Sequence, residues 1–301
     1  MDVTTIAGGS KADRTESPLA PYLPRLVHAW STEPDGPRFR IEHGTLVSVD
    51  ISGFTALAER LASKGRAGAE ELVRRISSCF DGLIEVADRH GGDVLKFRGD
   101  ALLLFFHGDR HEQRAAGAAS DMQWTIESIG SADSSVGPVD LRMSVGVHSG
   151  DCHFFLTELP HRELLVAGPA ATRVFGLEDL AAAGEIVLSA ETAAAVDSSW
   201  LADERDSARL MLRLEPGASI VPTPPDIPGA HLDAYVPAPL RAHLAVSSGE
   251  AEHRQVTVAF VKLSGTDELI AAEGPGALLE RIDTLAAVTA QACATYGLTW
   301  L

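Results

Sequence analysis

Two aspartates carry most of the chemistry that this sequence suggests. Asp50 ends the apolar run Leu46–Val49, and Asp100 precedes the apolar run Ala101–Phe106. A charge beside a buried strand is costly unless another group neutralises it, and two carboxylates that converge at one sheet edge offer the oxygen ligands that hard divalent cations prefer. Proteins usually bind Mg²⁺ through one or two carboxylates together with substrate phosphates. The pair therefore indicates metal-dependent nucleotide chemistry.

Taken one at a time, these residues have ordinary structural explanations. A strand-end aspartate such as Asp50 is most often an Asx turn or a helix N-cap, and Gly99-Asp100 is most often a hairpin turn. By the same reasoning, Lys96 is a solvated strand residue and Arg98 is a salt-bridge partner rather than a phosphate contact. The two aspartate motifs outweigh these explanations only together, because they occur in order and at predicted strand ends.

The bulk composition excludes several kinds of partner. The 301-residue chain has 42 acidic and 25 basic residues and a formal charge of -17, whereas nucleic-acid and anionic membrane surfaces require clustered Lys and Arg. A nucleotide is not excluded, because a divalent cation screens its phosphates. No apolar run approaches the roughly 20 residues that span a bilayer, and Cys79, Cys152 and Cys293 lack metal-ligand spacing. We expect a cytoplasmic protein without membrane insertion or a nucleic-acid partner.

Hydrophobic periodicity from Gly44 onward predicts an ordered domain. The order of elements is strand, helix, two hairpin strands, helix and strand, which is the βαββαβ order of a ferredoxin-like sandwich. We expect an α+β fold in which helices cover one face of a mostly antiparallel sheet. The predicted strands are Thr45–Ile51, Asp93–Arg98, Ala101–His107, Val139–His148, Leu164–Val166 and Glu185–Leu188, and the predicted helices are Phe54–Ser63, Ala69–His90, Glu112–Ile129 and a segment near Ala170–Ala183.

The end of the chain repeats the pattern of this domain. Val256–Gly265 (VTVAFVKLSG) matches Thr45–Gly53 (TLVSVDISG), and a helical pattern follows in both places. Lys262 stands where Asp50 stands in the first copy, so the second copy has lost this carboxylate. We predict a leader at 1–43, a first domain at 44–199, terminal strands and a Pro-rich linker at 200–252, and the truncated start of a degenerate second domain at 253–301.

Three segments of the first domain resemble the class III adenylyl/guanylyl cyclase catalytic domain. They are VSVDISGFTALAERL (Val47–Leu61), HGGDVLKFRGDALLLFF (His90–Phe106) and LRMSVGVHSG (Leu141–Gly150). The duplicated layout is similar to that of the tandem soluble, bicarbonate-responsive adenylyl cyclases and their bacterial relatives. This resemblance implies a lyase of intracellular signal transduction that converts ATP to 3′,5′-cyclic AMP and pyrophosphate.

The resemblance also implies a division of roles between two domains. One domain binds two Mg²⁺ or Mn²⁺ ions, here through Asp50, Asp100 and the carbonyl of Ile51. The turn formed by Ser52, Gly53, Phe54 and Thr55 would bind the triphosphate through backbone N–H groups. Base recognition and transition-state groups would come from the second domain, as the intramolecular partner in a pseudo-heterodimeric active site. The present chain is therefore expected to be inactive or weakly active by itself.

Lys96 has a different implied role in a tandem chain. It would face the second, pseudo-symmetric site, which the second copy completes with Lys262 in place of a metal ligand. Replacing a carboxylate by a lysine turns a metal site into an anion pocket. We expect Lys96 and Lys262 to form a regulatory anion or base site, with bicarbonate as the regulator.

One segment departs from the family pattern and keeps alternatives open. Family members that complete a homodimeric site carry an Asn and an Arg after the Leu164–Val166 strand, whereas this chain has Thr172 and Gly176 there and a displaced Arg173. A non-catalytic nucleotide- or bicarbonate-sensing module and a guanylate cyclase therefore remain alternatives. A diguanylate cyclase is disfavoured because its Gly-Gly-Asp/Glu-Glu-Phe signature is absent from the hairpin, and a P-loop ATPase because no phosphate-loop motif occurs.

Overall fold

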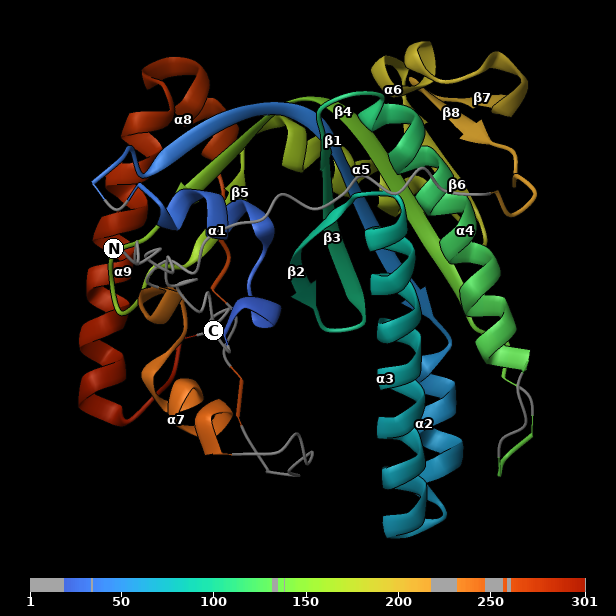
Figure 1. Cartoon of the computed structure of the whole chain (residues 1–301), viewed down its shortest axis with the longest axis horizontal. Coiled ribbons are helices and arrows are strands. Elements are labelled where there is room, and N and C mark those ends of the chain that lie inside the picture. Colours follow the sequence, from blue (N-terminus) through green and yellow to red (C-terminus); the bar gives the residue numbers. More distant parts are fainter. Residues whose placement is uncertain are drawn as a thin grey trace, which may run out of the picture.

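The centre of the molecule is one mixed sheet of eight strands, and helices lie against both of its faces (Figure 1). The computed structural model describes residues 19–33, 35–131, 135–137, 139–217, 232–246, 257–258 and 261–300. No helix within these ranges is long and apolar enough to cross a membrane. The strands are β1 (Phe39–Ser52), β2 (Asp93–Arg98), β3 (Ala101–His107), β4 (Arg142–Leu156), β5 (Leu164–Ala167), β6 (Ile186–Ser189), β7 (Leu201–Arg205) and β8 (Ala208–Met211). The helices are α1 (Arg25–Ser31), α2 (Phe54–Ala62), α3 (Gly65–Arg89), α4 (His111–Ser131), α5 (Pro169–Leu180), α6 (Ala190–Ala195), α7 (Ala238–Val246), α8 (Thr266–Glu273) and α9 (Pro275–Tyr296).

The predicted βαββαβ order and α+β class are confirmed. Strands follow the order β2-β3-β1-β4-β6-β8-β7 across the sheet, with β5 paired to β4. The central strand β1 is antiparallel to both β3 and β4, and only β4 and β6 are parallel among the described pairs. β1 and β4 are both longer than predicted, because Phe39 pairs with Phe155 and extends the ladder well beyond the motif.

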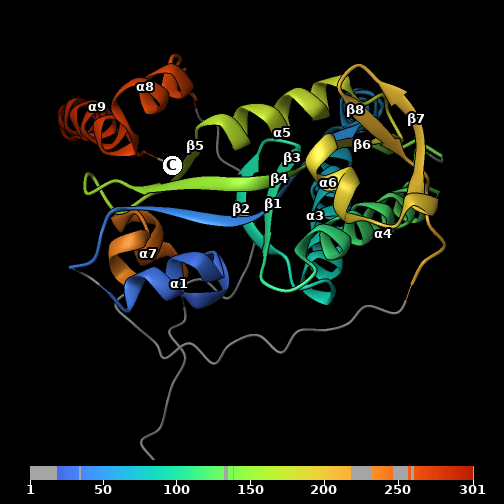
Figure 2. The same cartoon turned by 90° about the horizontal axis from the view of Figure 1, so that it is seen from above.

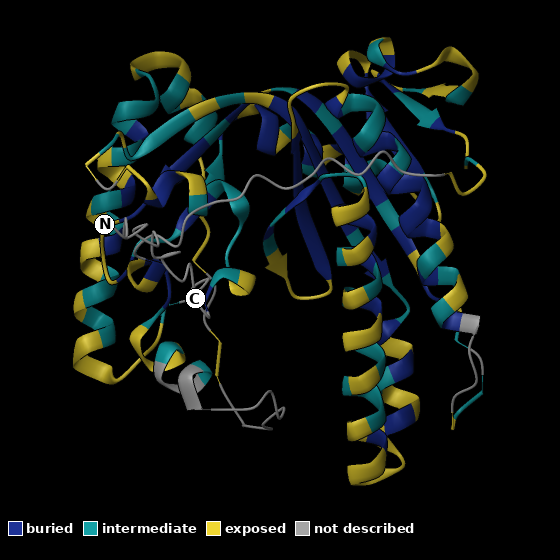
Figure 3. Cartoon of the chain, in the orientation of Figure 1, coloured by how far each residue is buried: buried dark blue, intermediate teal, exposed yellow. Residues whose placement is uncertain are grey.

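Helices cover both faces of the sheet, so the expectation of one covered face was wrong. Val47, Val49 and Ile51 of β1 pack with α2, α3 and α4 on one side, called here the α3 face. Leu46 and Leu103 pack with α1 and α5 on the other side, called the α5 face. An unbroken apolar strand such as β1 is typical of a strand buried on both faces. Figure 3 shows these central strands buried, while the outer side of α3 is exposed.

The described part of the predicted leader forms a short helix that is fixed to the sheet. The carboxylate of Asp93, at the start of β2, accepts N–H groups from Arg25 at 2.9 Å and Leu26 at 2.8 Å, which caps the first turn of α1. Trp30 is 2% exposed, and its indole N–H donates to the carbonyl of Pro37 at 2.8 Å. α1 therefore belongs to the core of the α5 face.

The last segment forms two helices that pack on the C-terminal end of β4 and on the neighbouring strand β5. Leu278 and Ile282 of α9 contact Phe155, and the guanidinium of Arg38 donates to both oxygens of Asp283 at 2.7 and 2.6 Å. Figure 2 shows α8 and α9 on one side of β1 and β4, and α1 and α7 on the other. Residues 257–258 and 261–265 form no strand, and the rest of the range 256–265 lies outside the described residues. A lone strand has no partner for its backbone groups.

Candidate active site

Asp50 and Asp100 lie at the same end of the β1–β3 ladder. Asp50 pairs with Ala101 in register, and the N–H of Ile51 donates to the carbonyl of Asp100 at 3.2 Å. Gly99, with φ of +72°, and Asp100 form the two-residue turn between β2 and β3. Asp50 is half-buried and Asp100 is exposed. The structure thus brings together the two carboxylates that the sequence singled out.

The electrostatics of this pair suit a divalent cation. Burial raises the pKa of Asp50, the Asp100 carboxylate raises it further, Arg98 opposes the shift and Asp179 adds to it. A hard cation between the two carboxylates would remove this repulsion and supply the oxygen coordination it prefers. Within the described ranges, no three or more His, Cys, Asp or Glu side chains converge on a metal position. Backbone carbonyls, water and substrate oxygens would therefore complete the coordination.

The turn after β1 forms the N-terminus of α2 beside Asp50. Gly53 is the N-cap residue with φ of +106°, and a Cβ there would lie 2.8 Å from the carbonyl oxygen of Asp140, so only glycine fits. Gly53 has no side chain that could cap this helix, and the first N–H groups of a helix lack intrahelical partners. Ser52, Phe54 and Thr55 complete the turn, with Phe54 buried and Thr55 exposed. Such a turn offers N–H groups to an anion.

Glu178 of α5 also lies near Asp50, and the sequence did not predict it. A Cβ at Gly146 of β4 would lie 2.4 Å from the carbonyl oxygen of Val174, so α5 packs directly on the strand backbone. This contact brings Glu178 to β1, where the hydroxyl of Ser48 donates to its carboxylate. The Arg98 guanidinium lies 3.7 Å from the same carboxylate and 4.2 Å from the ring centre of Phe175. The expected salt-bridge role of Arg98 is consistent with this contact.

Lys96 and Lys262 do not come together. The ammonium of Lys96 forms an ion pair with Glu163, whose carboxylate also contacts Nε2 of His161 at 2.9 Å. Burial lowers the pKa of Lys96 to about 8, although the contact with Glu163 opposes that shift. A cavity of about 750 Å³ opens beside Lys96 between α1, β2 and Tyr235. Lys262 is exposed in the segment before α8 and does not line this cavity.

The residues that replace the family's Asn and Arg lie on α5 and add no charge to the site. Arg173 donates to the carbonyl and the hydroxyl of Ser207 at 3.0 and 3.1 Å, which ties it to the β7–β8 turn. Among the described residues, and apart from its chain neighbours and the backbone of α5, no atom lies within 4 Å of a Cβ position at Gly176. The described part of the chain therefore presents two carboxylates beside the N-terminus of α2, and α5 contributes no arginine to them.

Comparisons with known proteins agree with this geometry. The adenylate and guanylate cyclase catalytic domain family matches residues 39–215. Adenylate cyclase type 10 of Mus musculus is 28% identical over 197 residues, which are 64% of this chain and 12% of that protein. Adenylate cyclase 1 of Rhizobium meliloti is 30% identical over 110 residues, 35% of this chain and 16% of that protein.

Solved structures show the same fold. A bacterial light-regulated adenylyl cyclase aligns with a TM-score of 0.50 and 15% identity, over 65% of this chain and 58% of that one. The chain spans only about an eighth of the mouse relative, so the match concerns the catalytic domain and not the whole protein. Because the family match covers more than half of the chain and the fold agrees with it, the chain belongs to the adenylate and guanylate cyclase catalytic domain family.

Proposed function

We propose that this chain is the metal-binding half of an adenylate cyclase, which converts ATP to 3′,5′-cyclic AMP and pyrophosphate. The observation that carries the proposal is the meeting of Asp50 and Asp100 at one end of the β1–β3 ladder, beside the Gly53 turn. ATP is favoured over GTP because similar proteins are named adenylate cyclases. A guanylate cyclase remains the alternative for the base.

Each group of the site would have a separate task. Asp50, Asp100 and the carbonyl of Ile51 would bind two Mg²⁺ or Mn²⁺ ions. These ions, when bound, would neutralise charge on the attacking and leaving oxygens. The N–H groups of Ser52–Thr55 would orient the triphosphate and stabilise charge that develops on it. The half-buried position of Asp50 would strengthen its interaction with a cation relative to water.

A second domain would supply the remaining groups, and the last helices support a tandem layout. Gly265 precedes α8 with φ of +79°, as Gly53 precedes α2 with φ of +106°. A short helix and a long helix follow in both places, with 8 and 22 residues in α8 and α9 against 9 and 25 in α2 and α3. We infer that residues 253–301 begin the partner domain of a pseudo-heterodimer in a cytoplasmic, bicarbonate-regulated protein.

The test compares the 301-residue chain with Asp50→Asn and with Asp203→Asn, whose carboxylate is exposed on β7. Binding of ATP and GTP is titrated with and without Mn²⁺, and cyclic AMP and cyclic GMP are measured. We expect Mn²⁺-dependent ATP binding, weakened at least 10-fold by Asp50→Asn and unchanged by Asp203→Asn, with slow cyclic AMP formation that Asp50→Asn abolishes. Equal binding by all three chains would contradict the metal role of Asp50.

A non-catalytic sensing module is the second candidate. Thr172 and Gly176 favour it, because neither side chain stabilises charge as the family's Asn and Arg would. Metal-dependent ATP binding that is lost in Asp50→Asn, without any cyclic nucleotide product, would select this candidate. Formation of cyclic GMP rather than cyclic AMP would instead select a guanylate cyclase.

A further inference from the structure

Arg98 lies in the same row of the sheet as Asp50. In register, Arg98 pairs with Ala101, Ala101 with Asp50, and Asp50 with Ser144. Directly opposite residues point to the same face, so these four side chains share the α5 face. A register shift between Val94 and Lys96 precedes this row in β2, and such bulges re-aim side chains.

The residues between and beyond the charged pair are small. Ala101 separates Arg98 from Asp50, and Ser144 lies on the far side of Asp50. Arg98 and Asp50 are two strands apart, roughly 10 Å at the usual strand spacing. The long arginine side chain can therefore extend over Ala101 toward the carboxylates of Asp50 and Asp100. It is the only cationic side chain among the four residues of this row.

The guanidinium of Arg98 has a fixed orientation, but its N–H donors make no hydrogen bonds to the described residues. It stacks on Phe175 at 4.2 Å and faces Glu178 at 3.7 Å, a distance too long for a hydrogen bond. Among the described residues it donates no hydrogen bond, and 47% of its side chain is exposed. A guanidinium has five N–H donors in a fixed fork. Here the stacking fixes the plane of the fork and leaves its donors available.

Neighbouring cations are already engaged elsewhere. Lys96 is paired with Glu163, Arg173 donates to Ser207, and Arg142 donates to Asp140 at 3.0 Å. Arg98 is thus the cation of this region whose donors no protein group uses within the described residues. A planar guanidinium matches phosphate oxygens in a bidentate geometry.

We propose that Arg98 binds the polyphosphate of the nucleotide at the Asp50–Asp100 site, and that Phe175 and Glu178 are its positioning residues. This inference rests on the proposed function, because it needs a nucleoside triphosphate at that site. Glu178 holds the guanidinium near the carboxylates while the site is empty of anions. A phosphate, with more charge and better-placed oxygens, then takes the free donors.

The experiment measures displacement of a fluorescent ATP analogue by ATP, ADP and AMP, with Mn²⁺ present. Arg98→Met keeps an apolar stem over Phe175 and removes the charge, whereas Arg98→Lys keeps the charge and loses the planar fork. Arg66→Met is the matched control, because Arg66 is 94% exposed and lies on α3. We expect Arg98→Met to weaken the binding of ATP about 10-fold, the binding of ADP less and the binding of AMP hardly at all. Arg98→Lys should lower the affinity for ATP about 3-fold, and Arg66→Met should leave it unchanged.

The way in which the loss of affinity depends on the number of phosphates distinguishes a direct phosphate contact from a purely structural role of Arg98. An Arg98 with a purely structural role would weaken ATP, ADP and AMP equally or not at all, and either result overturns the inference. Glu178→Gln should change ATP affinity 2- to 3-fold with the same dependence on phosphate number. If the unmodified chain binds ATP and Arg98→Met binds it equally, the inference fails while the proposed function stands. If the unmodified chain binds no ATP, both fail.

Discussion

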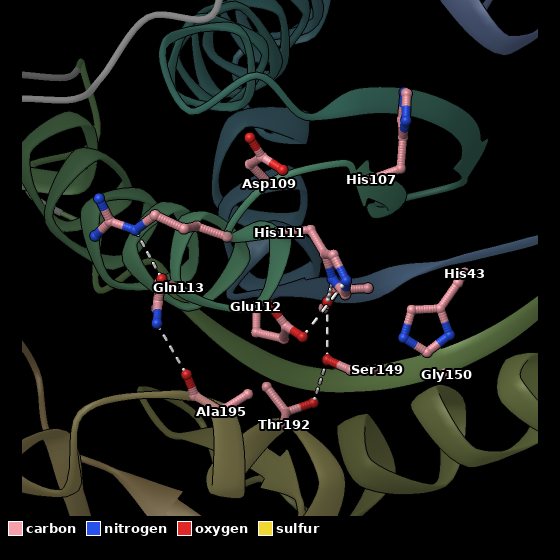
Figure 4. Close-up of polar contacts among 12 residues, drawn as sticks. His43, His107, Asp109, His111, Glu112, Gln113, Ser149, Gly150, Thr192 and Ala195 are labelled. Carbon is pink, nitrogen blue, oxygen red and sulfur yellow. Dashed lines mark hydrogen bonds and ion pairs between the residues drawn. The ribbon is translucent and has the colours of Figure 1, made fainter.

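The two ends of the β1–β3 ladder carry polar side chains in opposite states. At one end, the hydroxyl of Thr45 contacts Nδ1 of His111 at 2.7 Å and the hydroxyl of Ser149 at 2.8 Å. Ser149 in turn contacts Thr192 at 2.9 Å, and Figure 4 shows these two residues and His111. At the other end, the carboxylate of Asp50 accepts no hydrogen bond from the described residues. One end is a closed network, and the other is left open.

Whether a polar side chain already has hydrogen-bond partners distinguishes a structural role from a ligand-binding role better than its residue type does. Buried polar groups in native proteins are nearly always hydrogen-bonded, and unsatisfied ones require an explanation. The network at Thr45 satisfies itself and needs no ligand. The Asp50 end concentrates carboxylates and an unsaturated guanidinium, which a metal and phosphates would satisfy together. Substitutions at the closed end should therefore change stability, and those at the open end should change binding.

Lys96 gives the largest expected effect on stability, because it resembles a ligand-binding cation but is already paired with Glu163. Lys96→Met leaves the carboxylate of Glu163, only 16% exposed, without its ammonium partner and with only His161 beside it. Removing one member of a partly buried pair should cost about 3 kcal/mol of unfolding free energy. Urea denaturation measures the change, and ATP affinity should remain within about 2-fold if Lys96 lies outside the nucleotide site.

The double variant Lys96→Met/Glu163→Gln is the control for this prediction. Without the buried charge, most of the lost stability should return. A loss of ATP affinity as large as that of Asp50→Asn, with stability unchanged, would show instead that Lys96 binds the nucleotide. The structural role assigned to Lys96 would then be wrong.

Much of the open end was predictable because it is local in sequence. Asp50 and Asp100 flank apolar runs that form adjacent strands, so their order along the chain placed them at one sheet edge. Glu178 and Phe175 were not predictable, because they reach β1 through packing of α5 on Gly146. The Lys96–Glu163 pair spans distant segments and could not be predicted for the same reason.

The errors in the predicted fold have a similar origin. The apolar run of β1 indicated burial but not which elements provide it, so helices were expected on one face only. Ser149, Gly150 and Asp151 resemble a turn, yet β4 continues through them because each pairs with β1. Strand pairing at this point overrides local turn preference.

Thr45 should give an intermediate effect at the closed end. Thr45→Val keeps the shape and removes the hydroxyl, so Nδ1 of His111 loses its contact and Ser149 keeps only Thr192. Such a loss in a buried site costs about 2 kcal/mol. Thr45→Ser, which keeps the hydroxyl, should cost less in the same urea titration. Equal stability of the Val variant and the unmodified chain would mean that the network contributes nothing, and ATP affinity should not change in either variant.

The smallest effect concerns pH at His111. Burial lowers the pKa of this imidazole, the Glu112 carboxylate opposes the shift, and His43 adds to it. Because the folded-state pKa lies below the ordinary value of 6.5, the unfolded chain binds the extra proton first as the pH falls. Stability is therefore retained above pH 6.5 and decreases below it.

Other histidines also contribute to the change of unfolding free energy with pH, so the measurement must compare a His111 variant with the unmodified chain. Burial also lowers the pKa values of His148 and His161. His111→Asn keeps a polar atom near the Thr45 hydroxyl but cannot titrate, so its unfolding free energy should fall less between pH 7.5 and 5.5 than that of the unmodified chain. Identical slopes would mean that His111 is protonated equally in both states, and the closed end would then tolerate a charge as the open end does.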